Sequence, residues 1–343
     1  KPVSAASSGK KTKRMNEHEP NHPPKKVSKK KHGCLLPLLL FIVLIGIIAF
    51  FAFRFSVKGA FSKIKKYPLD KSNVTVNDTD TNIKDYQNIA LFGVDSQDNK
   101  ITDTGSRTDC IIIASIHKSN HKVKLMSIYR DTYVSIDGEY DKINAAYSYG
   151  GPELALRTIN RNLDLNITDF ATVNFKALAD AVDVLGGIPL TITSEKELKN
   201  LNDYIGNMNH INGVNSPKFD KVGTYTFDGN QAVAYSRIRY MEGGDHARAN
   251  HQRLVLEGIM NAAKKQPFKL GKLISTVLPQ CKTSLSDNDL TKLTFSMARS
   301  SITDSQAYPF QSEDERYGGI YYSFPITAKS NAIKAHEYLF GTK

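Results

Sequence analysis

Aspartate and arginine side chains stand beside three predicted strands of this 343-residue sequence. Asp95 directly follows the first strand, Arg107 and Asp109 come just before the second, and Arg130 and Asp131 directly follow the third. If the second and third strands form a hairpin, Asp109 and Arg130 lie at the same end of the sheet. Asp95 joins them there if its strand has the matching direction.

A second group of polar residues follows later in the chain. Arg237 and Arg239 are two residues apart, so in an extended segment they point the same way, whereas on a helix they would diverge. Arg248 and Gln252 share one face of a predicted helix. Several arginines with two or three carboxylates suit a diphosphate, because guanidinium groups bind phosphate oxygens bidentately and an aspartate pair can hold Mg²⁺. Together they would neutralise the charge that develops during phosphoryl transfer.

Simpler interpretations remain open for single residues. An Arg-Asp pair in a loop is usually a surface ion pair worth less than about 1 kcal/mol. Asp245 could cap the helix that follows it, and Asp131 could be a turn residue. His246 and His251 are five residues apart, a spacing that matches no metal-binding helix pattern. The sequence has no GxxxxGK[ST], GxSxG or HExxH motif, and its three cysteines exclude a disulfide-stapled scaffold.

These residues need a sheet to position them, and the periodicity predicts one. Strands and helices alternate irregularly, which predicts an α/β fold with a mixed, mostly antiparallel central sheet flanked by helices on both faces. Residues 194–224 are polar and irregular, and we expect a lid or surface loop there. The predicted strands are residues 88–94, 110–116, 123–129, 170–175, 188–192 and 318–324. The predicted helices are residues 145–163 with a break at Gly150 and Gly151, 176–184, 230–236, 246–264, one or two within 268–300, and 328–339.

The net charge of +12 is uneven along the chain. Residues 1–33 hold ten Lys/Arg and two Glu, which leaves a net charge of only +4 on the rest. That tail lacks the aromatic residues and the helix-turn-helix pattern of a nucleic-acid binder, so we expect no nucleic-acid partner. The uncharged apolar run over residues 35–53 follows directly, and its length matches a membrane span of about 20 residues.

The order of basic tail and apolar run predicts a single-pass type II protein of the cell membrane. A cleaved signal peptide is the competing interpretation, but the run is too long and ends without a small-residue cleavage pattern. We therefore expect four parts: a disordered cytoplasmic tail over 1–33, a transmembrane anchor over 34–55, an extracellular stalk over 56–85 and an outward catalytic domain over 86–343.

Seven ordered motifs resemble the LytR-CpsA-Psr family of Gram-positive-type bacteria, firmly over residues 86–265. They are Leu91–Asp95, Arg107–Asp109, Ser127–Thr132, Lys142–Tyr147 with Gly150 and Gly151, Leu185–Ile188, Asp228–Ala232 with Tyr235–Arg239, and Asp245 with Arg248 and Gln252. The resemblance implies a mixed sheet between helices with an apolar tunnel for a prenyl chain. It also implies transfer of an anionic glycopolymer, such as wall teichoic acid or capsular polysaccharide, from a polyprenyl-pyrophosphate lipid to a muramic acid hydroxyl of peptidoglycan, with a phosphodiester as the product.

The resemblance also implies roles for individual residues. Asp95 and Asp109 match the family's Mg²⁺ ligands (Mn²⁺ being an alternative ion), and Arg107, Asp109 and Arg130 are the expected catalytic residues. The expected pyrophosphate-binding residues are Arg107, Arg130, Arg237, Arg239, Arg248 and Gln252.

Three positions depart from the family pattern. The family often has Pro where Tyr129 stands, Arg where Ser96 and Gln97 stand, and Arg where His251 stands. These departures concern contacts to the variable donor headgroup. Two other functions stay open: a hydrolase acting on the same lipid-linked diphosphates, and a non-catalytic regulator of the cell envelope.

Overall fold

The computed structural model describes Gly59 and residues 61–74, 82–94, 101–102, 104–239 and 244–341. The chain divides into two units, Lys1–Ala49 and Phe50–Lys343, and every described residue belongs to the second. The predicted tail and membrane anchor lie outside the described residues. Within the described part, every helix is too short or too polar to cross a bilayer.

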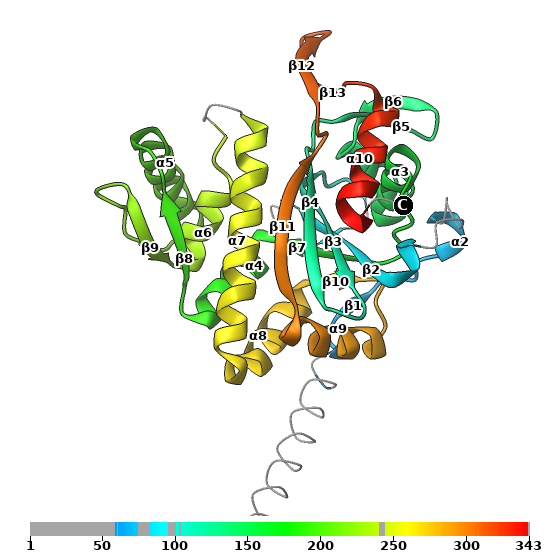
Figure 1. Ribbon diagram of the computed structural model, residues 1–343. Coiled ribbons are helices and arrows are strands. Elements are labelled where there is room, and N and C mark those ends of the chain that lie inside the picture. The colour runs from blue at the N-terminus through cyan, green and yellow to red at the C-terminus, as the bar shows by residue number, and fades with distance from the viewer. Residues whose placement is uncertain are drawn as a thin grey trace, which may run out of the picture. The chain divides into compact units, whose positions relative to one another are not determined.

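A seven-stranded mixed sheet forms the centre of the described region (Figure 1). Three of its six neighbouring pairs are antiparallel, including the hairpin predicted from the sequence, and three are parallel. The sheet is therefore evenly mixed rather than mostly antiparallel, because helical crossovers return two of its strands in the parallel direction. In spatial order the strands are β1 (Lys65–Lys66), β10 (Lys282–Thr283), β7 (Phe170–Asn174), β2 (Tyr86–Val94), β3 (Thr108–His117), β4 (Lys122–Ile128) and β11 (Ser301–Tyr308).

Alternating apolar residues along the strands bury both faces of this sheet. Ala90 and Phe92 of β2 pack in the cluster that includes α3 (Ala145–Leu163) and α10 (Ala328–Phe340). Ile89 of the same strand packs on the opposite face, with α9 (Asp287–Arg299), α8 (Leu270–Val277) and α7 (Asp245–Lys265). Helices on both faces of a mixed sheet were predicted, and the structure confirms them.

A third apolar cluster lies beside the sheet, with α7 between them (Figure 1). It joins α7 to the two-stranded sheet of β8 (Ile188–Ile192) and β9 (Gly223–Phe227). The helices α4 (Phe175–Leu185), α5 (Glu195–Asn212) and α6 (Gly229–Ser236) complete it. Two further hairpins extend from the central sheet: β5 (Tyr133–Ile136) with β6 (Glu139–Lys142), and β12 (Ser312–Tyr317) with β13 (Ile320–Pro325).

The prediction of a lid or loop over residues 194–224 was wrong. Helix α5 occupies most of that segment, and β9 begins near its end. The Ser194 hydroxyl accepts a hydrogen bond from the Glu197 amide and caps the helix, and Leu198, Leu201 and Ile205 bury one helix face. The many Asn and Lys residues between them occupy the exposed face and obscure the helical period.

The expected stalk over residues 56–85 also needs correction where it is described. Phe61, Ile64 and Val74 are buried in the sheet's two clusters, and β1 pairs with β10. The folded domain therefore begins before Tyr86. Only isolated apolar residues stand among the lysines of this segment. Their spacing forms no helical or strand period, so the sequence did not predict their burial.

Candidate active site

Asp109 and Arg130 meet at one end of the β3–β4 hairpin, as the sequence predicted. The ladder pairs Ile112 with Ser127, and on that register Asp109 falls opposite Arg130. A β-bulge against β2 occurs at this point, because Cys110 pairs with Gly93 while Thr108 pairs with Val94. Such a bulge re-aims a side chain without ending the sheet. The Asp109 carboxylate Oδ1 lies 2.6 Å from Arg130 Nη1.

Two residues from the later motifs also reach Asp109. Arg239, beyond the end of α6, places Nη2 3.3 Å from the Asp109 Oδ2 atom. The Gln252 side chain on α7 donates a hydrogen bond of 3.2 Å to the Asp109 backbone carbonyl. Arg248 lies one turn earlier on the same helix, is only 3% exposed, and acts electrostatically on Asp109. The structure thus brings Asp109, Arg130, Arg239, Arg248 and Gln252 together.

The charge balance keeps Asp109 ionised. Burial alone would raise its pKa, but the charges of Arg130, Arg248 and Arg239 and the hydrogen bond from Arg130 together lower the pKa below its ordinary value. Three cationic side chains therefore surround one carboxylate. This excess of positive charge suits an added anion with several oxygens, such as a diphosphate.

Arg130 is held from its other side by Asp131, which is a turn residue as its position allowed, and is buried. Arg130 Nε lies 3.4 Å from Asp131 Oδ2, and Lys142 Nζ lies 2.7 Å from Asp131 Oδ1. Lys142 ends β6, and sequence reasoning did not assign it a site role. Its place at the start of the Lys142–Tyr147 motif was the available signal.

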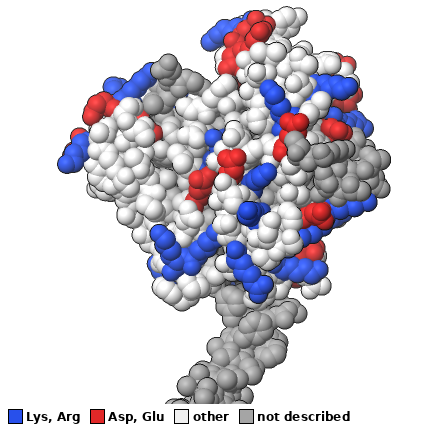
Figure 2. All heavy atoms as spheres, in the orientation of Figure 1, with Lys and Arg blue, Asp and Glu red and all other residues white. Residues whose placement is uncertain are grey.

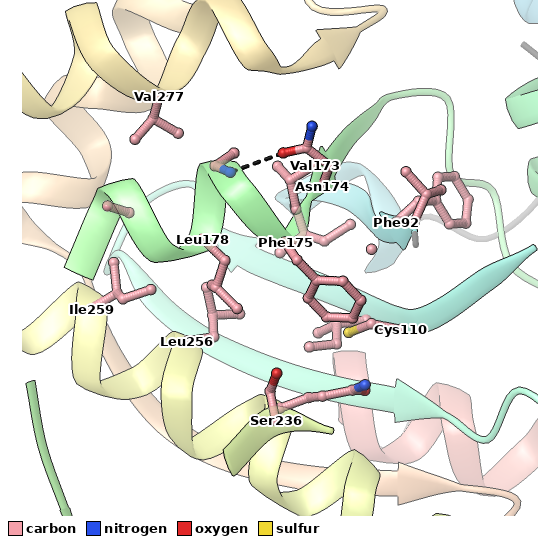
Figure 3. Close-up of a pocket in the computed structure, with 17 residues that line it drawn as sticks. Phe92, Cys110, Val173, Asn174, Phe175, Leu178, Ser236, Leu256, Ile259 and Val277 are labelled. Carbon is pink, nitrogen blue, oxygen red and sulfur yellow. Dashed lines mark hydrogen bonds between the residues drawn. The ribbon is translucent and has the colours of Figure 1, made fainter. Parts of the chain in front are cut away.

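An apolar cavity of about 240 Å³ opens beside these charged groups (Figure 3). Cys110 and Gly93 form the wall next to Asp109, and a β-carbon on Gly93 would lie only 2.8 Å from the Cys110 β-carbon. Phe175 and Leu178 of α4 point toward Cys110 and Leu256 across the cavity. Of its seventeen lining residues only Asn174, Ser236 and Gln252 are polar, so the cavity suits a hydrocarbon chain.

Arg237 packs against Phe175, one of the residues that line the same cavity. Its guanidinium stands 4.8 Å from the centre of the Phe175 ring, and its Nη1 contacts Met208 Sδ at 3.8 Å. Arg237 ends α6 as its C-cap residue, and the chain then leaves the helix, which lets Arg239 reach Asp109. Arg237 thus contacts Phe175 and Met208, and Arg239 contacts Asp109.

Arg107 is exposed in the loop before β3. Its charge acts on the Tyr149 and Tyr322 hydroxyls, which belong to α3 and β13. It lies two residues before Asp109, so it extends the positive region toward those tyrosines.

The structure does not describe the side chains of two residues from the sequence motifs. Asp95 lies outside the described residues, and for Asp245 only the backbone is described, at the start of α7. Among the residues that the structure describes, no group of three or more His, Cys, Asp or Glu side chains is placed to hold a metal ion.

Tyr129 and His251, two positions that depart from the family pattern, contact neighbouring side chains. The Tyr129 ring stacks on His246, with centroids 3.8 Å apart and planes 8° apart, and His246 Nε2 lies 3.2 Å from Asp314 Oδ2 of β12. His251 pairs with Glu197 instead of facing the charged cluster. Both histidines were left without a role from the sequence, and both connect α7 to neighbouring elements.

Comparison with known proteins agrees with this geometry. The model of the LytR_cpsA_psr family matches residues 51–337. The polyisoprenyl-teichoic acid–peptidoglycan teichoic acid transferase TagU of Bacillus licheniformis is 31% identical over 261 residues, which cover 74% of this chain and 78% of that protein.

Solved structures give the same result. A structure described as TagT bound to LI-WTA matches with a TM-score of 0.64 at 25% identity, covering 80% of this chain and 100% of that one. A second, the LytR-CPS2A-psr family protein YwtF (TagT) with bound octaprenyl pyrophosphate lipid, matches with a TM-score of 0.60 at 25% identity, covering 80% and 99%.

Proposed function

Because the chain belongs to the LytR-CpsA-Psr family, we propose that it transfers an anionic glycopolymer from a polyprenyl-pyrophosphate carrier to peptidoglycan and forms a phosphodiester. One observation carries this proposal. The cluster of Arg130, Arg239 and Arg248 around Asp109 stands directly beside an apolar cavity. A lipid-linked diphosphate needs these two environments side by side, one for its charge and one for its hydrocarbon chain.

The proposed reaction uses the arginines to hold the diphosphate. The acceptor hydroxyl oxygen forms a bond to the phosphorus nearer the glycan, the bond from that phosphorus to the bridging oxygen breaks, and prenyl phosphate leaves with that oxygen. The hydroxyl proton passes to a base or to water. Arg130 and Arg239 stabilise the charge on the phosphoryl oxygens as it shifts toward the leaving group.

Asp109 is better suited to orient the arginines than to act as the base. Its lowered pKa makes it a weak proton acceptor near neutral pH, and both carboxylate oxygens already contact guanidinium groups. We therefore assign Asp109 the role of fixing Arg130 and Arg239 in place.

A divalent cation, Mg²⁺ or Mn²⁺, fits this site as part of the proposal. Asp109 is an ionised oxygen donor beside the proposed diphosphate, and Asp95 is the next residue after Val94, which pairs with Thr108. When bound, such an ion would supply further positive charge to the diphosphate. Manganese binding followed by electron paramagnetic resonance should weaken in Asp95→Asn and Asp109→Asn, and unchanged binding in both would overturn this assignment.

We also propose that the apolar run over residues 35–53 anchors the protein in the cell membrane as a single-pass type II protein, with the described domain outside. The basic tail before the run and the prenyl-linked substrate support this arrangement. Protease protection of an N-terminal tag in intact cells, with digestion of a C-terminal tag, is the expected result, and the opposite pattern would reject it.

A purified transfer assay tests the function. Full-length protein in detergent is mixed with a lipid-linked polymer donor and peptidoglycan strands, and Arg130→Ala and Asp109→Ala should abolish transfer. Arg157→Ala is a matched control, because Arg157 also pairs with an aspartate, Asp137, but on the surface. Transfer at the wild-type rate in both site variants would reject the site.

The same assay separates the two alternatives. A hydrolase would release the headgroup equally well without acceptor, whereas a transferase needs the strands for product. If site variants restored polymer attachment in a deletion strain, the non-catalytic regulator would be the correct function.

A further inference from the structure

Several tyrosines gather beside the charged cluster, on the side away from the apolar cavity. Tyr140 on β6 and Tyr149 on α3 are 62% and 59% exposed. The Tyr140 ring stacks on Tyr133, with centroids 5.3 Å apart and planes 19° apart. Tyr133 in turn packs edge-on against Tyr322 of β13. The exposed Tyr140 ring therefore rests on an aromatic base of Tyr133 and Tyr322.

Polar groups suited to hydroxyls accompany these rings. The Tyr149 hydroxyl donates a 2.5 Å hydrogen bond to Asp141 Oδ2, and the Lys142 amide donates to Asp141 Oδ1 at 2.7 Å. A carboxylate offers about four acceptor positions, so Asp141 retains capacity beyond these two bonds. The hydrogen bond from the Tyr149 hydroxyl to Asp141 raises the pKa of Tyr149, and burial is a smaller cause. The raised pKa keeps that hydroxyl protonated.

Backbone hydrogen bonds connect the segments that carry these tyrosines to the proposed diphosphate site. The Asn144 amide donates to the Arg130 carbonyl, and the Gly105 amide in the loop before Arg107 donates to the Ser148 carbonyl beside Tyr149. Lys142 Nζ bridges the two regions, since it pairs with Asp131 and stands 5.3 Å from the centre of the Tyr322 ring. The tyrosines therefore keep a fixed position relative to Arg130.

The direction of the cavity determines which part of a bound prenyl diphosphate lies near the tyrosines. The cavity runs from Gln252 along α7 to Ile259 and reaches Val277 of α8, at the lower end of the domain in Figure 1. Hairpin β5–β6 lies at the opposite, upper end. A prenyl diphosphate with its chain in the cavity would therefore direct its glycan toward the tyrosines.

We propose that Tyr140 and Tyr149, with Asp141 between them in sequence, form a saccharide-binding shelf beside the diphosphate site. A pyranose ring has an apolar C–H face and a hydroxyl edge, which match an exposed aromatic ring and a neighbouring carboxylate. The shelf rests on the proposed function and adds a subsite to it. The saccharide comes from the donor polymer or from the peptidoglycan acceptor.

Steady-state transfer kinetics of the full chain in detergent distinguish these two sources. The donor is a prenyl diphosphate carrying one disaccharide, the acceptor is soluble glycan strands from amidase-treated peptidoglycan, and each is varied at saturating amounts of the other. Tyr140→Ala and Tyr149→Ala should each raise one of the two KM values about tenfold, with kcat within about twofold. The substrate whose KM rises, donor or acceptor, is the one whose saccharide binds to the shelf.

Two further variants and one binding measurement complete the test. Tyr149→Phe keeps the ring and should give a smaller rise than Tyr149→Ala. Phe268→Ala removes another strongly exposed aromatic ring, outside the shelf, and should change neither KM. Unchanged KM values in both alanine variants would overturn the shelf while leaving the proposed function intact.

If the wild-type protein transferred nothing, saturation-transfer NMR with the same glycan strands and with the free donor disaccharide would still decide. Signal that is lost in Tyr140→Ala supports the shelf, and absence of signal with wild-type protein for both saccharides rejects it.

Discussion

Glu197 Oε1 lies 2.8 Å from His251 Nε2 in the cluster that joins α5 to α7, and both side chains are buried. Burial alone would raise the pKa of Glu197, but hydrogen bonds from His251 and from the Thr193 hydroxyl and amide lower the pKa to about 2. His251 directly precedes Gln252, whose side chain holds the Asp109 carbonyl. The pair therefore fixes the rotation of α7 that presents Gln252 to the site.

The first prediction concerns acid stability. A carboxylate whose folded pKa is about 2, against an ordinary 4.5, stabilises the fold above pH 4.5 and loses that contribution as the pH falls toward 2. Glu197→Gln should therefore lower the free energy of unfolding by about 3 kcal/mol at pH 7, and the difference should shrink below pH 4.5. Urea unfolding at both pH values measures it. The exposed Glu195→Gln on the same helix is the control, and a pH-independent loss would contradict the linkage.

The second prediction distinguishes guanidinium geometry from charge. Arg130→Lys keeps the charge but loses the planar fork between Asp109 and Asp131, so kcat for transfer should fall about a hundredfold. Arg239→Lys should cost less, because Arg239 makes one longer contact and its side chain is 41% exposed. Arg157→Lys on the surface should have no effect. Wild-type kcat in both lysine variants would show that only charge matters.

The third prediction concerns the length of the prenyl chain. Ala181 lines the cavity on α4, six residues beyond Phe175, which corresponds to about 9 Å along a helix. Ala181→Phe should block the deeper part of the cavity. Transfer from a donor with a long prenyl chain should fall at least about tenfold, while a short-chain donor should lose little. Thermal unfolding checks that the variant still folds, and equal loss with both donors would argue against a hydrocarbon chain in this cavity.

The fourth prediction concerns Cys110, which forms the cavity wall beside Asp109. Burial raises the pKa of its thiol to about 12, and burial does the same for Cys281. At pH 8 only about one thiol in ten thousand would be ionised. In a Cys34→Ser background, Ellman's reagent should therefore react far more slowly than with free cysteine. Rapid reaction at Cys110 would indicate a wet, open cavity.

The core of the site could be predicted because it depends on strand register. Asp109 and Arg130 flank a hairpin whose two strands and turn are visible in the sequence, and their distance follows from that pairing alone. Arg248 and Gln252 were placed by helical spacing. Arg237 was harder to place, because its contact with Phe175 depends on where α6 ends.

The remaining features depend on contacts between distant segments. Tyr133, Tyr149 and Tyr322 belong to three separate elements, so no local pattern connects them. Glu197 lies in the segment predicted to be irregular, which hid both α5 and its pairing with His251. Burial of Phe61 depends on a parallel pairing between β1 and β10, which lie more than 200 residues apart.

The backbone of residues 130–132 has a consequence for how the protein opens. The Arg130 carbonyl accepts from Asn144, the Thr132 carbonyl from Ile143, and the Asp131 carbonyl from Ser323, so strand β4, hairpin β5–β6 and hairpin β12–β13 all meet there. None of these segments can detach without disturbing the others, and amide protons across them should therefore exchange as one cooperative unit. A backbone disturbance at these three residues should consequently weaken the fold and displace Arg130 at the same time.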